Sequence, residues 1–339
     1  MNLSIIIVNY RSWGYLQTAL DALLPGFPFH DWEIIVVDNE SESHLFNKFK
    51  SCFPKISFIA NPINGGYAFG ANLGAAQAKG EHLIFMNPDV IVNCNDVVHL
   101  MAEKKQLSDV ALLTPKQIDS KGRVQKTYDV FPDLLNHFRT IKGLMRILKP
   151  EKYPDPRADI RTVIYPDWVC GSFLLISRKD FDIIDGWNED YWLYAEDIDL
   201  CRRARNLQLQ AACTPKVTIV HMHGGSSRSS ENITVLSKLE VIISKNVFAQ
   251  RHSKGLRLLL NQLIIVFVNL PVLLLAAILN IVTLQSVRAL RLRGYIFSEL
   301  MLYYMSALKS SIWLSPRALA NKSGAHRNSF NCDTRIQKN

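Results

Sequence analysis

The sequence predicts an α/β fold with a central, mostly parallel sheet, followed by a C-terminal helical segment. In the N-terminal third, short apolar runs rich in β-branched residues alternate with segments of helical periodicity. Polar residues follow several of these runs, and near the C-terminus residues 258–287 hold no charged side chain. A chain of 339 residues can form one large domain with an appended region, and we expect the boundary near residue 250.

The predicted elements alternate in order along the chain. Uninterrupted apolar runs, typical of buried parallel strands, occur at residues 3–9, 33–39, 56–60, 81–86 and 110–114. Helical periodicity occurs at residues 14–24, 43–53, 69–78 and 96–106. Ligands of such sheets bind at the carboxyl ends of the strands, where this sequence places Asn9, Asp38 and Asp89. The alternative is that these three are ordinary turn residues.

The middle of the chain is less regular. We expect a hairpin at residues 117–130, an irregular surface segment at 131–165, and a strand at 168–177 that runs through Gly171. A helix at 179–184 and short strands at 210–214 and 217–220 follow. Beyond them, His221 and His223 are candidate ligands of a metal or a phosphate, although an isolated histidine in a loop is more often neither.

Residues 187–203 combine five carboxylates with four aromatic side chains and lead into a predicted helix. A general base requires a carboxylate held near a substrate hydroxyl, so Glu196, Asp197 and Asp199 are candidates. The alternative is a plain helix N-terminus, where unpaired N–H groups and the helix dipole favour acidic residues.

Seven short motifs carry a resemblance to a known family. They are IIIVNY at 5–10, VVDNES at 36–41, NGGYAFGANLG at 64–74, FMNPDV at 85–90, WVCG at 168–171, YAEDIDL at 194–200 and HxxGxS at 221–226. In this order they resemble glycosyltransferase family 2 over about residues 3–228, in particular the rhamnosyltransferase-like branch that builds bacterial O-antigens and other surface polysaccharides. The resemblance implies the nucleotide-sugar-binding GT-A fold for residues 1–250 and an inverting transferase.

The resemblance also implies roles for the matching residues. Those expected to bind the nucleotide-sugar donor are Asn9, Asp38, Asn64, Gly66, Asn72, Asn87 and Asp89. The family's Asp-x-Asp reads Asn87-Pro88-Asp89 here, so Asp89, with His221 as a further ligand, would hold Mg²⁺ or Mn²⁺ on the donor diphosphate. This metal would neutralise charge on the departing nucleoside diphosphate.

Asp197 is expected to take the proton from the acceptor hydroxyl, with Glu196 and Asp199 left open as alternatives. The acceptor pocket is expected to include Trp168, Gly171 and Trp192. The branch suggests dTDP-rhamnose as the donor and a lipid-linked saccharide as the acceptor. One departure is Trp187-Asn188-Glu189, where the family more often has Phe-Asp-Glu.

Two alternative functions are to be weighed against the sequence. A nucleotidyltransferase would need a basic, glycine-rich triphosphate loop after the first strand, and residues 9–13 lack one. A membrane-bound scaffold with an inactive transferase domain would not need its carboxylates, yet Asp38, Asp89 and Asp197 are all present.

The net charge of +9 is concentrated in the C-terminal region. From Arg251 onward the chain has 12 Lys and Arg and two acids; the totals of 39 and 30 leave 27 basic and 28 acidic residues for 1–250. A nucleic-acid-binding domain would carry its basic residues on a folded face, so we expect no nucleic acid partner. Basic residues interleaved with apolar runs fit an anionic membrane surface.

The uncharged run 258–287 is 30 residues long, whereas about 20 suffice to span a bilayer. Basic residues flank it on both sides, which disagrees with a single span, and Pro271 predicts a kink. We therefore expect residues 251–318, including a second apolar stretch at 295–314, to associate with a membrane as a bent hairpin or as interfacial helices. The alternative is a helical subdomain packed on the catalytic domain. Residues 319–339 are expected to be a disordered tail.

The six cysteines are scattered without a CxxC pair or zinc spacing, which is typical of a reducing cytosol. The first residues lack the basic segment and the long apolar core of a signal peptide. We therefore expect a peripheral or monotopic protein at the cytoplasmic face of a bacterial inner membrane.

Overall fold

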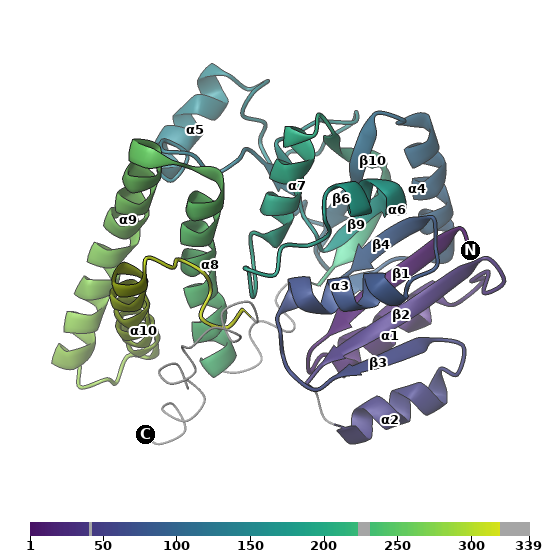
Figure 1. Cartoon of the computed structure of the whole chain (residues 1–339), viewed down its shortest axis with the longest axis horizontal. Helices are drawn as coiled ribbons and strands as arrows, with labels where there is room; N and C mark the ends of the chain where they lie inside the picture. Colours follow the sequence, from purple (N-terminus) through teal and green to yellow (C-terminus); the bar gives the residue numbers. More distant parts are fainter. Residues whose placement is uncertain (41–42, 223–230, 319–339) are drawn as a thin grey trace. The chain divides into compact units, whose positions relative to one another are not determined.

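The computed structural model describes residues 1–40, 43–222 and 231–318, which form two compact units (Figure 1). The first unit comprises residues 1–131, 144–188 and 196–222, and the second comprises 132–143, 189–195 and 231–318. The chain therefore passes repeatedly between the units. His223, Gly224, Ser226 and the expected tail 319–339 lie outside the described residues.

Ten strands and ten helices are found in the described residues. The strands are β1 (Leu3–Asn9), β2 (Trp32–Asn39), β3 (Ser57–Asn61), β4 (His82–Met86), β5 (Val90–Ile91), β6 (Val110–Ile118), β7 (Tyr128–Asp129), β8 (Trp168–Val169), β9 (Phe173–Ser177) and β10 (Gln210–His221). The helices are α1 (Trp13–Leu23), α2 (Ser43–Cys52), α3 (Tyr67–Gln77), α4 (Cys94–Gln106), α5 (Arg139–Leu148), α6 (Arg178–Ile183), α7 (Glu196–Asn206), α8 (Glu231–His252), α9 (Gly255–Val282) and α10 (Arg288–Ser310).

One eight-stranded sheet organises the first unit, in the order β3-β2-β1-β4-β9-β6-β10-β5. Neighbouring strands from β3 to β4 are parallel, as are β6 and β10. β9 runs antiparallel to β4 and β6, and β5 runs antiparallel to β10. The expected mostly parallel sheet is confirmed, and its parallel half brings the carboxyl ends of β1 and β2 to one edge.

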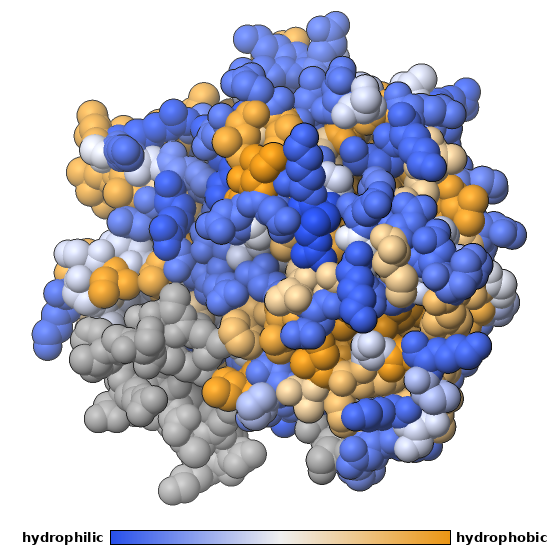
Figure 2. Space-filling model, turned by 45° about the vertical axis from the view of Figure 1, so that its right-hand side comes forward, coloured by the Kyte–Doolittle hydropathy of each residue, from blue (hydrophilic) through white to orange (hydrophobic). Residues whose placement is uncertain are grey.

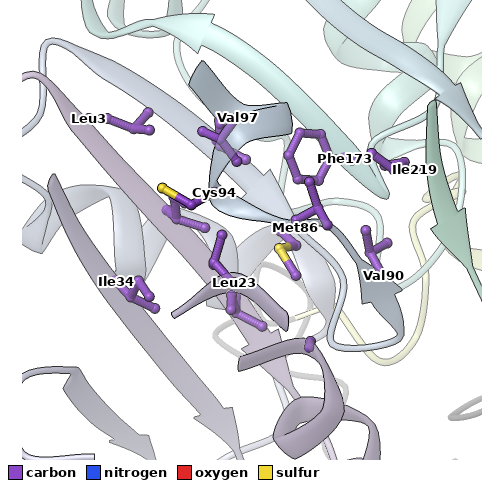
Figure 3. Packing of buried hydrophobic residues seen from close by; sticks show 14 of the residues in the cluster. Leu3, Leu23, Ile34, Met86, Val90, Cys94, Val97, Phe173 and Ile219 are labelled. Carbon is purple, nitrogen blue, oxygen red and sulfur yellow. The ribbon is translucent and has the colours of Figure 1, made fainter. Parts of the chain in front are cut away.

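Helices cover both faces of this sheet, which explains why β1 is apolar along most of its length. On one face, Leu3 packs in a core with Leu23 of α1 and Val97 of α4 (Figure 3). On the other face α3 lies so close that a Cβ at Gly74 would approach Cγ2 of Ile6 to 2.5 Å. Alternate residues of the strand therefore meet different helices, as the period of two in a strand requires.

Several predicted boundaries were wrong. The strand expected at 168–177 is two short strands in different sheets, because the pairing partner changes at Gly171: the N–H of Cys170 donates to the carbonyl of Thr127, whereas the carbonyl of Ser172 accepts from the N–H of Asn87. The two strands expected at 210–214 and 217–220 form one strand, β10, with a register shift between Thr214 and Thr218. The segment 131–165, expected to be irregular, contains α5.

The second unit contains the long helices α8, α9 and α10. The sequence analysis assigned no element to α8, which spans 22 residues and buries eleven of them. The kink predicted at Pro271 does not interrupt α9, which is continuous from Gly255 to Val282. Proline has no N–H, so one backbone hydrogen bond of the helix is missing at this position. Leu273 and Ala276 after the proline are buried, as is Ile265 before it, so packing on both sides stabilises the continuous helix.

α9 buries two amide side chains among apolar ones and exposes many further apolar side chains. Asn261 and Gln262 are buried, and the Gln262 side chain donates to the carbonyl of Asn246 on α8 over 3.1 Å. By contrast, Phe267 and Ile281 are 71% and 72% exposed. By length and composition α9 is the one helix in the described residues that could cross a membrane.

Candidate active site

The carboxyl ends of β1 and β2 hold a buried pair of polar side chains. The parallel register sets Asn9 opposite Asp38, and Nδ2 of Asn9 donates to Oδ1 of Asp38 over 2.8 Å. Asn9 is fully buried and Asp38 is 4% exposed. Within the described residues the amide oxygen of Asn9, Oδ1, accepts no hydrogen bond. A buried polar atom of this kind is usually satisfied by water or a ligand, so this strand end is a candidate binding position.

The loop after β3 is fixed to the same strand ends by amide side chains. Nδ2 of Asn61 donates to Oδ1 of Asn39, and Nδ2 of Asn39 donates to the carbonyl of Gly66, each over 2.8 Å. Oδ1 of Asn64 accepts from the N–H of Gly66 over 3.1 Å. Gly66 has a φ of 89°, which favours glycine, and it precedes the first turn of α3. The loop backbone is therefore held in one conformation beside Asp38.

Asn39 and Asn61 belong to this arrangement but were not among the predicted site residues. Each is the last residue of its strand, β2 and β3. Their position at strand ends could have identified them as site residues, since Asn9 and Asp38 were selected because they lie at the ends of strands. The pairing of the two asparagines follows from the register of β2 and β3, which the sequence alone does not show.

Asn72 of α3 makes two hydrogen bonds with the backbone of Trp187, one as donor and one as acceptor. Its Nδ2 donates to the Trp187 carbonyl over 2.8 Å, and its Oδ1 accepts from the Trp187 N–H over 2.9 Å. Both ends of the amide are thereby engaged. Asn72 holds the start of the acidic stretch against α3.

Asp89 and His221 meet because β5 pairs with β10. The register sets Val90 opposite His221, and the N–H of Met222 donates to the carbonyl of Asp89 over 2.9 Å. Nε2 of His221 lies 3.3 Å from Oδ1 of Asp89, and the two residues are 6% and 5% exposed. Asn87, two residues earlier, is tied through its N–H to the carbonyl of Ser172.

Gln117 and Ser172 orient the imidazole of His221, and neither was predicted as a site residue. Oγ of Ser172 donates to Oε1 of Gln117 over 2.9 Å, so this oxygen acts as an acceptor. Nδ1 of His221 lies 3.0 Å from the same oxygen and is therefore the protonated nitrogen. Nε2, the other ring nitrogen, then faces the carboxylate of Asp89. No local sequence signal marks Gln117, since it lies 104 residues from His221.

This donor pair fits a divalent cation. Two ligands at about 2.1 Å on adjacent positions of an octahedral ion stand about 3 Å apart, close to the observed 3.3 Å. Carboxylate oxygen and imidazole nitrogen both suit Mn²⁺, and the carboxylate suits Mg²⁺. Across residues 1–40, 43–222 and 231–318 no group of three His, Cys, Asp or Glu side chains is placed to hold a metal.

Asp197 lies in the first turn of α7 and contacts the backbone of Gly171. The N–H of Gly171 donates to Oδ2 of Asp197 over 3.1 Å, and the N–H of Ile198 donates to Oδ1 over 2.8 Å. Burial raises the pKa of Asp197, and these N–H groups oppose the increase. A carboxylate with a raised pKa is a better proton acceptor, which suits a general base.

Glu196 and Asp199 have different surroundings. Asp199 is fully buried, and its Oδ2 accepts from Nε of Arg203 over 2.7 Å. The same guanidinium donates to the carbonyl of Gly186 over 2.7 Å. Asp199 therefore fixes Arg203 against the loop after α6. Glu196, in the first turn of α7, is 8% exposed.

The aromatic residues expected in an acceptor pocket fall in two units. Trp168 is half-buried in the first unit, where its Nε1 donates to the carbonyl of Val130 over 3.0 Å. Gly171 is also in the first unit. Trp192 belongs to the second unit, where the guanidinium of Arg317 lies 5.9 Å from its ring centre.

The second unit holds the loop of residues 189–195 that precedes α7. Asp190 forms an ion pair with Arg251 at the end of α8, and the carbonyl of Leu193 accepts from Oγ of Ser244 over 2.8 Å. The next two residues, Tyr194 and Ala195, have φ values of 70° and 65°. Two consecutive left-handed residues are uncommon outside glycine, and they turn the chain sharply into α7.

The α/β fold is that of the GT-A class. The mannosyltransferase PcManGT from Pyrobaculum calidifontis, solved in complex with GDP-Man and Mn²⁺, superimposes with a TM-score of 0.51 at 12% identity, covering 95% of this chain and 83% of that one. This likeness confirms the expected GT-A fold. The family model for glycosyl transferase family 2 matches residues 4–160. The protein therefore carries a glycosyltransferase family 2 domain and is a glycosyltransferase.

Characterised relatives of low identity share about two thirds of the chain. The rhamnosyltransferase WbbL of Escherichia coli K12 is 26% identical over 238 residues, covering 66% of this chain and 85% of its own. The low-salt glycan biosynthesis hexosyltransferase Agl10 of Haloferax volcanii is 29% identical, covering 65% and 67%. The N-acetylglucosaminyl-diphospho-decaprenol L-rhamnosyltransferase of Mycobacterium tuberculosis is 23% identical, covering 65% and 75%.

Proposed function

We propose that the protein transfers a hexose or deoxyhexose from a nucleotide-sugar to a lipid-linked saccharide, with inversion at the anomeric carbon, during synthesis of a bacterial surface polysaccharide. The observation that carries this proposal is the carboxylate of Asp197 in the first turn of α7, which the N–H of Gly171 fixes and whose pKa is raised by burial. Rhamnose from dTDP-rhamnose is the favoured donor sugar, because the relatives from E. coli and M. tuberculosis are named rhamnosyltransferases.

The donor nucleotide binds at the carboxyl ends of β1 and β2. The buried Asp38 accepts from the base, and Asn9 orients its carboxyl group through the 2.8 Å hydrogen bond. The backbone of the loop from Asn64 to Gly66 approaches the nucleotide, since glycine leaves room there. Asn72 acts on the donor indirectly, because its amide is engaged with the Trp187 backbone.

Asp89 and His221 would hold a Mg²⁺ or Mn²⁺ ion beside the donor diphosphate. When bound, the ion supplies positive charge to the departing nucleoside diphosphate. Gln117 and Ser172 keep Nδ1 of His221 protonated, so that Nε2 is available as a ligand. The N–H of Asn87, bonded to the Ser172 carbonyl, fixes the backbone that carries Asp89.

Asp197 receives the proton of the acceptor hydroxyl. As that oxygen bonds to the anomeric carbon, the bond to the leaving phosphate oxygen breaks on the opposite face, which inverts the configuration. Asp199 does not share this role, because its carboxylate is paired with Arg203 in the interior. Glu196 precedes the base in the first turn of α7 and is buried beside it.

The enzyme works at a membrane surface, at the cytoplasmic face of the inner membrane. α9 supports this location, since it turns Phe267 and Ile281 outward and buries Asn261 and Gln262. Large exposed apolar surfaces of this kind are typical of sites that bind a membrane or another protein. The decaprenol-linked substrate in the name of the M. tuberculosis relative supports a lipid-linked acceptor.

The decisive experiment compares three carboxylate variants of the full-length protein. A panel of nucleotide-sugars with Mn²⁺ identifies the donor by release of nucleoside diphosphate, and transfer is then measured at saturating donor. Asp197→Asn should lower kcat by about 10²–10⁴-fold with donor binding nearly unchanged. Asp199→Asn should lower thermal stability more than kcat, and Glu196→Gln should lower kcat less than Asp197→Asn.

Two outcomes would count against the assignment. If Asp199→Asn abolishes turnover in a folded protein while Asp197→Asn retains it, the base has been misplaced by two positions. If all three variants keep the kcat of the unmodified enzyme, these carboxylates are structural and the catalytic base lies elsewhere.

A further inference from the structure

α5 has its charged and apolar residues on opposite sides. At 3.6 residues per turn, Ile141, Leu144, Met145, Ile147 and Leu148 fall on one side of the helix. The basic residues Arg139, Lys142 and Arg146 fall on the other side. Such a separation is typical of a helix with two different environments.

The orientation of α5 is the reverse of that expected in water. Nη2 of Arg146, on the basic side, lies 3.2 Å from Oδ1 of Asp129, which is 1% exposed. The apolar side chains of Leu144, Ile147 and Leu148 are 54%, 79% and 64% exposed. A buried carboxylate of the first unit therefore binds Arg146 on the basic side, while Leu144, Ile147 and Leu148 on the apolar side remain exposed.

Exposed apolar residues are common on proteins, and their number alone decides nothing. Figure 2 shows one face of the molecule on which hydrophobic residues form several patches between hydrophilic ones. What distinguishes α5 is that its apolar residues share one side of one helix whose opposite side is fixed by a buried carboxylate. In the second unit α9 also exposes large apolar side chains, among them Phe267 and Ile281.

The charge around α5 indicates what covers its apolar side. Residues 139–152 include five basic residues, Arg139, Lys142, Arg146, Lys149 and Lys152, and one acid, Glu151. This basic excess complements an anionic lipid surface, which attracts lysine and arginine close to the headgroups. A helix of 10 residues is about 15 Å long, half the thickness of a bilayer core, so it can lie in the interface but not cross it.

We propose that α5 is a membrane-binding helix that inserts Leu144, Ile147 and Leu148 among the headgroups and upper acyl chains of an anionic bilayer. Lys142 and Lys149, at the border between the two sides of the helix, contact lipid phosphates. This contact is separate from α9. The proposal rests on the proposed function, since a lipid-linked acceptor requires the enzyme to work at a membrane.

The test uses the full-length protein with vesicles of phosphatidylglycerol and phosphatidylcholine, or of phosphatidylcholine alone. The variant Leu144→Ser/Ile147→Ser/Leu148→Ser should bind anionic vesicles at least tenfold more weakly than the unmodified protein. The matched control Ile183→Ser/Leu207→Ser removes two apolar side chains that are 52% and 47% exposed on the same unit, and it should bind normally. Hydrolysis of the donor by water, measured without vesicles, should be unchanged in both variants.

A second measurement reports on α5 directly, in case α9 dominates binding. Ile147→Cys, in a background where Cys52 and Cys332 are serine, carries an environment-sensitive dye that should shift to shorter wavelengths with anionic vesicles. The same dye on Ile183→Cys should not shift. Equal vesicle affinity of the triple-serine variant together with an unshifted dye at residue 147 overturns the proposal.

Two further outcomes separate this proposal from its rivals. If the unmodified protein dimerises in solution and only the triple-serine variant is monomeric, with vesicle binding unchanged, the apolar side binds a second copy and the lipid proposal fails. If no nucleotide-sugar is turned over by the unmodified protein, the proposed function fails, whereas the vesicle and dye results still decide the role of α5.

Discussion

The backbone N–H of Gly171 donates to Oδ2 of Asp197 over 3.1 Å, and no side chain fits between the two residues. A Cβ on Gly171 would lie 3.2 Å from Cβ of Asp197 and 3.1 Å from Cη2 of Trp187. Glycine is therefore required here because of a close approach between two segments. The position of the proposed base depends on a residue that contributes only its backbone.

Gly171→Ala should reduce kcat by roughly tenfold or more, because the added methyl group displaces Asp197 by a few tenths of an ångström. Donor affinity should stay within about twofold, since the residues proposed to bind the nucleotide are elsewhere. Steady-state kinetics at saturating donor, with calorimetric titration of the nucleoside diphosphate, separate the two effects. Gly14→Ala is the matched control, because a Cβ there meets nothing within 4 Å. Unchanged kcat in Gly171→Ala would mean that Asp197 need not be held in this position.

The raised pKa of Asp197 predicts the acid side of the pH profile. The base is active only when ionised, so kcat should fall as the pH drops through the pKa of this group. Because burial raises that pKa, the fall should begin at a higher pH than an exposed aspartate would give. The residual activity of Asp197→Asn should lack this inflection. An inflection that persists in the variant assigns the titration to another group.

Asp38→Asn should weaken donor binding by about tenfold, which corresponds to about 1.4 kcal/mol and to the loss of one charge-assisted hydrogen bond. The substitution keeps the shape of the side chain, and the amide can still meet Asn9. Calorimetric titration with the nucleoside diphosphate measures the change. Asp21→Asn on α1, whose partner is the exposed Gln17, should bind like the unmodified protein. Equal affinity in both variants would exclude Asp38 from the donor site.

The buried pair Glu240–Arg317 predicts a stability that depends on pH. Nη1 of Arg317 lies 2.8 Å from Oε1 of Glu240, which is fully buried. Burial raises the pKa of Glu240, and Arg317 opposes the increase. Arg317→Met leaves the carboxylate uncompensated and should cost about 3–5 kcal/mol at neutral pH.

The sign of the pH effect follows from proton binding. Without Arg317, the pKa of Glu240 in the folded state rises further above its unfolded value, so the folded state binds more protons between the two values. Stability then falls as the pH rises through this window and recovers as the pH is lowered. Urea unfolding at pH 7.5 and pH 5 should show a smaller deficit at the lower pH, and Glu240→Gln/Arg317→Met should lose this dependence. The exposed Arg293→Met is the control, and a loss below about 1 kcal/mol in Arg317→Met would contradict the prediction.

Local sequence patterns were sufficient to predict the parallel half of the sheet. Apolar runs located β1, β2 and β4 to within a residue or so, because a strand covered on both faces must be apolar along its length. The same runs showed where Asn9 and Asp38 fall at the strand ends. Their 2.8 Å contact then followed from the parallel register, which aligns the two positions.

Long-range pairing was not predictable in the same way. Nothing near Gln117 indicates that it meets His221, and nothing near Asn72 indicates a bond with Trp187, which is 115 residues away. The strand predicted at 168–177 was too long, because most of its residues favour a strand. The strand is interrupted at Gly171, whose N–H donates to Asp197, and this contact between distant residues is not visible in the local sequence.

The repeated passage of the chain between the two units limits how such enzymes can be recombined. A chimaera that exchanges everything after residue 250 pairs Asp190 of one parent with residue 251 of the other, and Trp192 with a foreign residue 317. Both contacts hold the loop that leads into Asp197. A graft that also carries residues 132–143 and 189–195 keeps these partners together. The helical unit therefore cannot be exchanged as one continuous piece of sequence. A change of acceptor by exchange of this unit would require three segments to be replaced together: 132–143, 189–195 and the residues after 230.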